Sequence, residues 1–276
     1  MIAAMACYVM NDALVKLTTA YFPAGQLLAV RGFFASIVIL GLVRGIAAPG
    51  DWRRLLVPIM GWRCLLEITT AASSVAALSL APLATVTAIM MTAPLIIAAS
   101  VMALGWEPVR GGRVLAGLTG FAGAVLVLRP FAQGDGSGWG ICFALVCALS
   151  LAARDLVTRQ IPSGIPSAMI ALVTTVAVAL AGVALGSSET WQPLERRETA
   201  VLALAAVCAA LGNYALIAAC RGVDLSVVTP FRYSSIVWAI LLGFVFWGDM
   251  PEAMSVMGIA LIVAGGLYTL HANRRT

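Results

Sequence analysis

Ten apolar runs, each about as long as a bilayer is thick, follow one another along this chain with little between them. The hydrocarbon core of a bilayer is about 30 Å thick and takes roughly 20 helical residues to cross. Runs of about that length, bounded by glycine, proline and charged residues, lie at residues 2–20, 24–43, 57–79, 83–103, 111–129, 138–157, 166–186, 199–220, 225–247 and 253–271. We therefore predict an all-α membrane protein with ten transmembrane helices.

The composition excludes a water-soluble globule. Of the 276 residues, 62% are hydrophobic and 11% are charged, whereas soluble domains carry about 25% charged residues. The formal net charge of +5 comes mainly from arginines at the ends of the runs, so we expect membrane lipid and no nucleic acid as a partner. The six cysteines lie in apolar runs and the single histidine is His271, so we expect no metal site and no cofactor.

Basic residues in the connections predict the orientation of the chain. Residues 1–10 have no basic start, so we expect the first run to be a span and not a cleavable signal peptide. Ten arginines lie in one set of connections and at the C-terminus, against three in the opposite set, which places both termini in the cytoplasm and the chain in a bacterial inner membrane. The first set is Arg44, Arg53, Arg54, Arg110, Arg113, Arg154, Arg159, Arg221, Arg274 and Arg275, and the second is Arg129, Arg196 and Arg197.

The two halves of the chain carry related patterns. NDALVK at 11–16 has the charge spacing of RDLVTR at 154–159, an offset of 143 residues. Trp106 and Trp247 match at an offset of 141, as do Gly117 and Gly258. We predict two five-helix repeats, residues 1–132 and 133–276, within one membrane domain. Because five is odd, the second repeat starts from the opposite side of the membrane and the repeats are inverted.

Charged side chains lie deep in the first two runs, where lipid would reject them. Asp12 and Lys16 are one helical turn apart. They form either an ion pair that orders helix packing or, with Asn11, part of a substrate route. Arg31 in the second run is expected to pair with Asp12 or to bind a substrate carboxylate.

Three further charged residues lie in the third and ninth runs. Arg63 is close enough to the cytoplasmic face for its guanidinium to reach water, whereas Glu67, one turn further on, is deeper. Glu67 is either held in a helix interface, neutral or paired with Arg63, or open to the substrate. Pro230 predicts a bend in the ninth run. Arg232 is expected either to hold a substrate carboxylate or to be neutralised by Glu67 or by the cytoplasmic interface.

Weaker candidates complete the predicted site. Asn213 and Tyr214 lie in the eighth run, where a lone asparagine often only bridges helices. Methionines at 90 and 91 are expected mainly to pack, tryptophans at the run ends to form an aromatic belt, and glycines to permit close helix approach. The candidate substrate-binding residues are Asn11, Asp12, Lys16, Arg31, Glu67, Met90, Asn213, Tyr214, Arg232, Tyr233 and Trp238.

Three stretches give the chain a family resemblance. They are LLAVRGFFASIVIL at 27–40, LAPLATVTAIMMTAPLIIAASVMALGWE at 80–107 and VDLSVVTPFRYSSIVWAILLGFVFWGDMP at 223–251. With the glycine-rich runs that follow the last two, they resemble the drug/metabolite transporter superfamily in its EamA-type, ten-helix branch. The resemblance implies a substrate pathway between the two halves, with the fifth and tenth runs at the periphery.

The resemblance also implies a small-molecule substrate. The chain is similar in outline to bacterial amino-acid exporters, and the opening VMNDALVKL resembles members that handle amino acids, S-adenosylmethionine or vitamins. Amino-acid export is therefore the leading expectation, and import of S-adenosylmethionine or a vitamin is the alternative. Ten helices can enclose a cavity without help, so a monomer suffices.

Enzyme chemistry has no support in the sequence. The motifs HExxH and GxSxG and paired GxGD-type aspartates are absent, as is an ATP-binding loop. We therefore expect a transporter working by alternating access, rather than an intramembrane enzyme or a non-transporting subunit. Transport is either facilitated or driven by an ion gradient. Asp12 and Glu67 are the carboxyl groups deep enough to couple it to protons.

Overall fold

The part of the chain that the structure describes is mainly helical. The computed structural model describes residues 1–16, 18, 21–46, 57–80, 86, 89–106, 111–128, 138–221, 225–247 and 253–274. These residues form helices and no strand, so the predicted all-α class is confirmed for them. The elements are α1 (Ile2–Lys16), α2 (Ala24–Ile46), α3 (Pro58–Leu80), α5 (Ala93–Ala103), α6 (Gly111–Leu128), α7 (Gly138–Gln160), α8 (Ser167–Gly186), α9 (Arg196–Cys220), α10 (Leu225–Val228), the 3₁₀ helix η2 (Thr229–Tyr233), α11 (Ser234–Trp247) and α12 (Ala253–Arg274).

The helices follow the apolar runs, and α10, η2 and α11 share the run at 225–247. By length and composition, the helices Ala24–Arg44, Gly138–Gln160, Ser167–Gly186 and Arg196–Cys220 are able to cross a membrane. Together they make the chain a multi-pass membrane protein. The count of ten spans and the inverted order of the repeats stay predictions.

Prolines fix two of the helix starts. Pro166 precedes α8 with an extended backbone (φ −60°, ψ 138°), and it cannot itself donate a hydrogen bond. Pro94 lies in the first turn of α5, where a missing N–H is not needed by the helix. Both prolines therefore mark where a helix begins.

The chain divides into two compact units, and each unit takes helices from both halves of the sequence. The first unit contains Met1–Ile2, Thr69–Leu156 and Gly222–Thr276, and the second contains Ala3–Ile68 and Val157–Arg221. The division cuts α3 and α7, so each of these helices contributes to both units.

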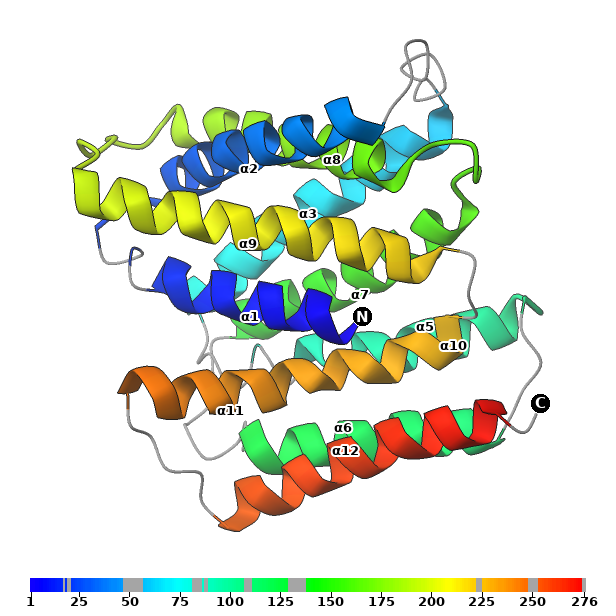
Figure 1. The fold of residues 1–276 in the computed structure, drawn as a ribbon. Coiled ribbons are helices and arrows are strands. Elements are labelled where there is room, and N and C mark those ends of the chain that lie inside the picture. The colour runs from blue at the N-terminus through cyan, green and yellow to red at the C-terminus, as the bar shows by residue number, and fades with distance from the viewer. Residues whose placement is uncertain are drawn as a thin grey trace. The chain divides into compact units, whose positions relative to one another are not determined.

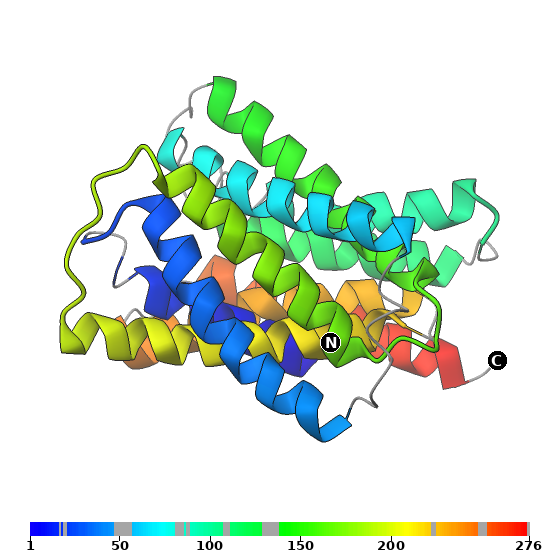
Figure 2. The ribbon, with the colours of Figure 1, turned by 90° about the horizontal axis from the view of Figure 1, so that it is seen from above.

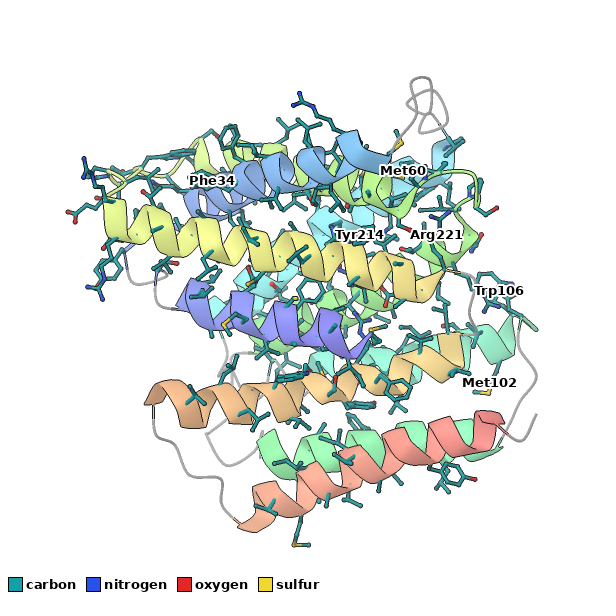
Figure 3. The ribbon with its side chains drawn as sticks, in the orientation of Figure 1. Phe34, Met60, Met102, Trp106, Tyr214 and Arg221 are labelled. Carbon is teal, nitrogen blue, oxygen red and sulfur yellow. The ribbon has the colours of Figure 1, made fainter. Side chains whose placement is uncertain are left out.

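Within the second unit, α2 packs along α8, and α9 lies against both (Figures 1 and 2). Small residues let the first two helices approach closely. A Cβ atom on Gly32 would lie 2.7 Å from the Cβ of Ala179, and one on Gly182 would lie 2.5 Å from the backbone nitrogen of Ala29. Buried Met60 and half-buried Phe34 and Tyr214, all marked in Figure 3, belong to the apolar cluster beside this contact.

Within the first unit, α6 packs along α12 (Figure 1). A Cβ atom on Gly123 would lie 2.6 Å from the carbonyl oxygen of Gly258, so the predicted close approach through glycines is confirmed at this pair. Ala124, Ile236 and Ile262 form a buried apolar cluster with Tyr233. The run-end tryptophans 106, 139 and 191 are exposed, as an aromatic belt requires, and the side chain of Trp247 lies outside the described residues.

Candidate functional site

The ninth span is interrupted at its proline. Helix α10 ends at Val228, the 3₁₀ segment η2 follows over Thr229–Tyr233, and α11 begins at Ser234. A short 3₁₀ segment within a longer helix often marks a functional hinge. The disturbance predicted at Pro230 is therefore confirmed as a change of helix type.

The fourth span is interrupted as well. Met91 and Thr92 form a turn before α5, and the Thr92 hydroxyl donates to the carbonyl oxygen of Ile89 at 2.6 Å. The sequence analysis placed both residues inside a span at 83–103, which stays a prediction, and gave no sign of this break. The break follows from Pro94, which lies in the first turn of a new helix. At the offset of 141, Met91 and Thr92 correspond to Arg232 and Tyr233.

The two interruptions lie against each other within the first unit. Helix α5 packs against α10 and η2, and Ser235 Oγ lies 3.9 Å from Met91 Sδ. Helices broken at corresponding positions of two repeats are the usual pointer to a transporter's binding site. Met90, a predicted site residue, is half-buried and packs beside Ala77 and Ala144.

Three buried charged groups meet at η2, and we call them the η2 charge cluster. Nη1 of Arg232 forms an ion pair with Oδ2 of Asp155, and Nε of Arg154 lies 3.2 Å from Oδ1 of the same carboxylate. Arg232 and Arg154 are each 5% exposed and Asp155 is 1% exposed. The predicted neutralisation of Arg232 by Glu67 or by the cytoplasmic interface was therefore wrong, since α7 supplies its partner.

Arg154 also corrects the orientation argument. It was counted among the arginines of the connections, but it lies buried inside α7. The tally then falls from ten to nine against three, which leaves the predicted bias in place.

Two hydroxyl groups beside the cluster are buried. Within the described part of the chain, Tyr233 Oη and Ser234 Oγ have no hydrogen-bond partner. A buried hydroxyl without a partner costs free energy, and a native structure usually gives it a protein, water or ligand partner. The ring of Tyr233 lies against Gly120 of α6, and Trp238, one turn after Ser234, is half-buried.

A separate buried ion pair lies in the second unit. Arg63 has no exposed surface. It pairs through Nη1 with Glu67, and its Nε donates to Thr158 Oγ1 at 2.8 Å. The prediction that its guanidinium reaches water was wrong, because α7 supplies a hydroxyl and α3 a carboxylate in the interior. The pairing of Glu67 with Arg63, one of the predicted alternatives, is confirmed.

The polar residues of α1 and α2 are described in part. Nη1 of Arg31 donates to Oδ1 of Asn11 at 3.2 Å, and Asn11 is buried. Both residues lie in the second unit. Asp12 and Lys16 lie in α1, but their side chains fall outside the described residues, and their roles stay predictions.

Asn213 and Tyr214 contact neighbouring groups of the second unit, and their role in binding stays a prediction. Nδ2 of Asn213 donates to Thr174 Oγ1 at 3.3 Å and to Thr175 Oγ1 at 3.4 Å, joining α9 to α8. Its Oδ1 is buried without a partner among the described residues. Tyr214 packs against the apolar cluster of the second unit.

Arg221, at the end of α9 (Figure 3), contacts the connection between α7 and α8. Its guanidinium donates to the carbonyl oxygens of Pro162 and Ile165, each at 2.7 Å, and to Ser167 Oγ at 3.0 Å. Burial lowers the pKa of this guanidinium from its ordinary value, although an arginine stays charged at physiological pH.

The structure thus sorts the predicted residues into groups. Arg232, Tyr233 and Trp238 lie on or beside the interruption in the first unit. Asn11 and Arg31 contact each other in the second. Sequence reasoning missed Asp155. The repeat offset of 143 that aligns NDALVK with RDLVTR also aligns Asp12 with Asp155. That correspondence was the available signal.

Comparisons with known proteins agree with the predicted resemblance. Residues 138–270 match the EamA-like transporter family. The chain is 29% identical to a riboflavin transporter of Rhizobium johnstonii, over 78% of this chain and 72% of the relative. It is 24% identical to an S-adenosylmethionine uptake transporter of Rickettsia conorii, over 96% and 89%, and 27% identical to the pseudopaline exporter of Pseudomonas aeruginosa, over 92% and 88%.

A crystal structure shares the fold. It superposes with a TM-score of 0.84 at 21% sequence identity, covering 99% of this chain and 96% of the other. At that identity the likeness establishes the fold alone.

Proposed function

We propose that this chain, which belongs to the EamA-type branch of the drug/metabolite transporter superfamily, carries amino acids or their close derivatives. It does so as a small-molecule transporter of a bacterial membrane. The observation that carries the proposal is the η2 charge cluster at two interrupted helices. A guanidinium and a carboxylate side by side match the carboxylate and ammonium of an amino acid.

We place the substrate route at these interruptions. A 3₁₀ segment and a turn inside two spans leave backbone carbonyl groups outside regular helical bonding, which membrane proteins tolerate where a polar cavity forms. The unpartnered hydroxyls of Tyr233 and Ser234 supply additional hydrogen-bonding capacity for a polar solute.

Inverted repeats and alternating access form part of the proposal. Helices that occupy the same place in the two predicted repeats pack on each other, as α2 does on α8 and α6 does on α12. A pseudo-two-fold axis in the membrane plane would bring such pairs together. For amino acids we propose export, with both termini in the cytoplasm.

The alternative is import of another metabolite. The relatives include an S-adenosylmethionine uptake transporter and a riboflavin transporter. S-adenosylmethionine is an amino-acid derivative and presents the same carboxylate and ammonium, whereas riboflavin presents neither. The chemistry of the cluster therefore favours the first over the second.

Counterflow into liposomes tests the proposal. Purified protein is reconstituted, the vesicles are loaded with unlabelled compound, and uptake of the labelled compound is followed for amino acids, S-adenosylmethionine and riboflavin. We expect accumulation of one or more amino acids or of S-adenosylmethionine. Accumulation of riboflavin alone would replace the proposal with the vitamin alternative, and accumulation of nothing would overturn both.

A further inference from the structure

We propose that Asp155 and Arg232 are the two halves of one zwitterion site that closes on itself when empty. With substrate bound, Arg232 holds the substrate carboxylate and Asp155 holds its ammonium. When the substrate leaves, the two side chains pair with each other, as the structure shows them. This inference rests on the proposed function and adds a residue, Asp155, and a state of the empty carrier.

The location of the pair distinguishes it from an ordinary structural ion pair. Arg63 and Glu67 lie one turn apart on the same helix, so no movement of one helix against another separates them. Asp155 lies on α7 and Arg232 on η2, 77 residues further along the chain. A shift of the 3₁₀ segment against α7 therefore opens this pair and leaves the helices themselves intact.

Charge balance explains why the partner must carry both charges. An isolated charge in the interior of a membrane protein is costly, and breaking a buried pair by removing one partner leaves the other uncompensated. A zwitterion inserted between Asp155 and Arg232 replaces both partners at once. An ammonium alone would leave Arg232 without the carboxylate that it loses when the pair opens, and a carboxylate alone would leave Oδ2 of Asp155 without a donor.

Arg154 fits this arrangement as a positioning residue. Its Nε lies 3.2 Å from Oδ1 of Asp155, while Arg232 holds Oδ2. Each oxygen of the carboxylate therefore has its own guanidinium. When Arg232 turns to a substrate, Arg154 still holds one oxygen of Asp155 and leaves the other free for the substrate ammonium.

The inference also bears on energy coupling. In the empty carrier Arg232 takes the place of the substrate ammonium at Asp155, so the return step needs no ion at this pair. We therefore infer that exchange of substrate proceeds without an imposed proton or sodium gradient.

The test replaces the pair by an apolar one. Exchanging a buried ion pair for hydrophobic residues of similar size is often neutral for folding, so Asp155→Leu/Arg232→Met is chosen over either single change. Counterflow of L-methionine is measured in liposomes without ion gradients, alone and in the presence of excess amine formed by removing its carboxyl group or acid formed by removing its amino group. Melting temperature in detergent is measured in parallel.

We expect the double variant to melt below the wild-type temperature, because buried Arg154 also loses its contact with Asp155. Where it folds, we expect it to exchange methionine at least about tenfold more slowly, since a site built for polar groups discriminates strongly between substrates. We expect neither one-charge analogue to compete with methionine in the wild type. Glu195→Leu/Arg196→Met removes two exposed charges at the start of α9 and is expected to exchange methionine at the wild-type rate.

Two outcomes overturn the inference. Wild-type exchange by the Asp155→Leu/Arg232→Met variant would make the pair structural, and strong competition by either one-charge analogue would show that the site does not require both charges. If the apolar variant fails to fold, the competition measurement on the wild type still decides. Failure of the wild type to exchange any amino acid or S-adenosylmethionine would instead overturn the proposed function itself.

Discussion

Arg63 has no exposed surface, and its guanidinium is held by two groups of different kinds. Glu67 supplies the counter-charge from the same helix, and Thr158 supplies a hydroxyl from α7. In a medium of low polarity, a charged or polar group without a partner costs more free energy than it does in water. The role of this cluster is therefore to join α3 to the end of α7.

This arrangement predicts an asymmetry between single and double substitutions. Arg63→Ala removes the guanidinium that pairs with the Glu67 carboxylate in the interior and is expected to destabilise the protein by about 3–5 kcal/mol. Arg63→Met/Glu67→Leu removes both charges, and we expect its melting temperature in detergent to lie well above that of the single variant. Equal melting temperatures for the two variants would mean that the charge of Glu67 is compensated elsewhere.

At the scale of single residues, the sequence identified the buried charged residues more reliably than it identified their ion-pair partners. The spacing of four correctly suggested that Arg63 contacts Glu67, because that contact is made within one helix. The contact between Arg232 and Asp155 joins two helices, and no local pattern encodes which helix faces which. Asp155 also follows Arg154 directly in the sequence. Two adjacent charged residues are typical of the end of a span, so the pair was not assigned to the interior.

At the scale of the element, α2 and α8 meet through small residues. A Cβ on Gly32 would lie 2.7 Å from Ala179 Cβ and 2.9 Å from its Cα, closer than neighbouring atoms can pack. The same helix carries Gly41, where an added Cβ meets nothing within 4 Å. The two glycines therefore form a matched pair of sites on one helix.

We predict opposite effects at these two glycines. Gly32→Ala is expected to destabilise the protein by about 1–3 kcal/mol, because the core contact is overfilled. Gly41→Ala is expected to be neutral or to stabilise by up to about 1 kcal/mol, because alanine favours the helix. Melting temperature in detergent checks both, and a similar loss in the two variants would contradict the close contact of α2 with α8.

The N-terminus of α2 is capped from a distant loop. The Glu189 carboxylate accepts hydrogen bonds from the backbone N–H of Gly25 at 2.9 Å and of Gln26 at 3.3 Å. The Gln26 side chain in turn exchanges two hydrogen bonds with the backbone of Gln192. The connection between α8 and α9 is thereby fastened to the start of α2.

Removing this cap has a defined cost. Glu189→Ala leaves N–H groups at the start of α2 without an acceptor and is expected to cost about 1 kcal/mol, as loss of a helix cap does. Glu195→Ala is the control, because Glu195 lies in the same connection but makes no side-chain cap. Amide hydrogen exchange at Gly25 and Gln26 is expected to quicken in the first variant, and unchanged exchange there would contradict the cap.

The elements themselves were largely predictable, because apolar runs of bilayer length leave few choices other than helices. The turn at Met91 and Thr92 was not predicted. Pro94 was read as part of the interior of a span, whereas it lies in the first turn of α5. The residues before it, Met90, Met91 and Thr92, do not interrupt the apolar run, so hydropathy does not show the break.

At the scale of the whole molecule, the orientation proposed from the arginines has a direct test. Ser163 and Ser188 are both exposed and lie in the connections at opposite ends of α8. In a variant without the six native cysteines, Ser188→Cys is expected to react with a membrane-impermeant maleimide in intact cells. Ser163→Cys is expected to react after permeabilisation alone, and the reverse pattern would invert the proposed topology.

The family and the all-helical class followed from hydropathy and from three stretches of sequence, because these properties are spread over the whole chain. The substrate does not follow in the same way. Relatives of similar overall likeness bear names of chemically different substrates. In our proposal the substrate is set by a few polar groups such as Arg232, so the η2 charge cluster has to be tested directly.

Counterflow of a labelled amino acid into liposomes that contain the purified wild-type protein, with no ion gradient present, tests the central claim most directly. The account predicts that internal unlabelled amino acid drives transient accumulation of the labelled compound above its external concentration. Equal labelling of loaded and empty vesicles, across the amino acids and S-adenosylmethionine, would contradict it.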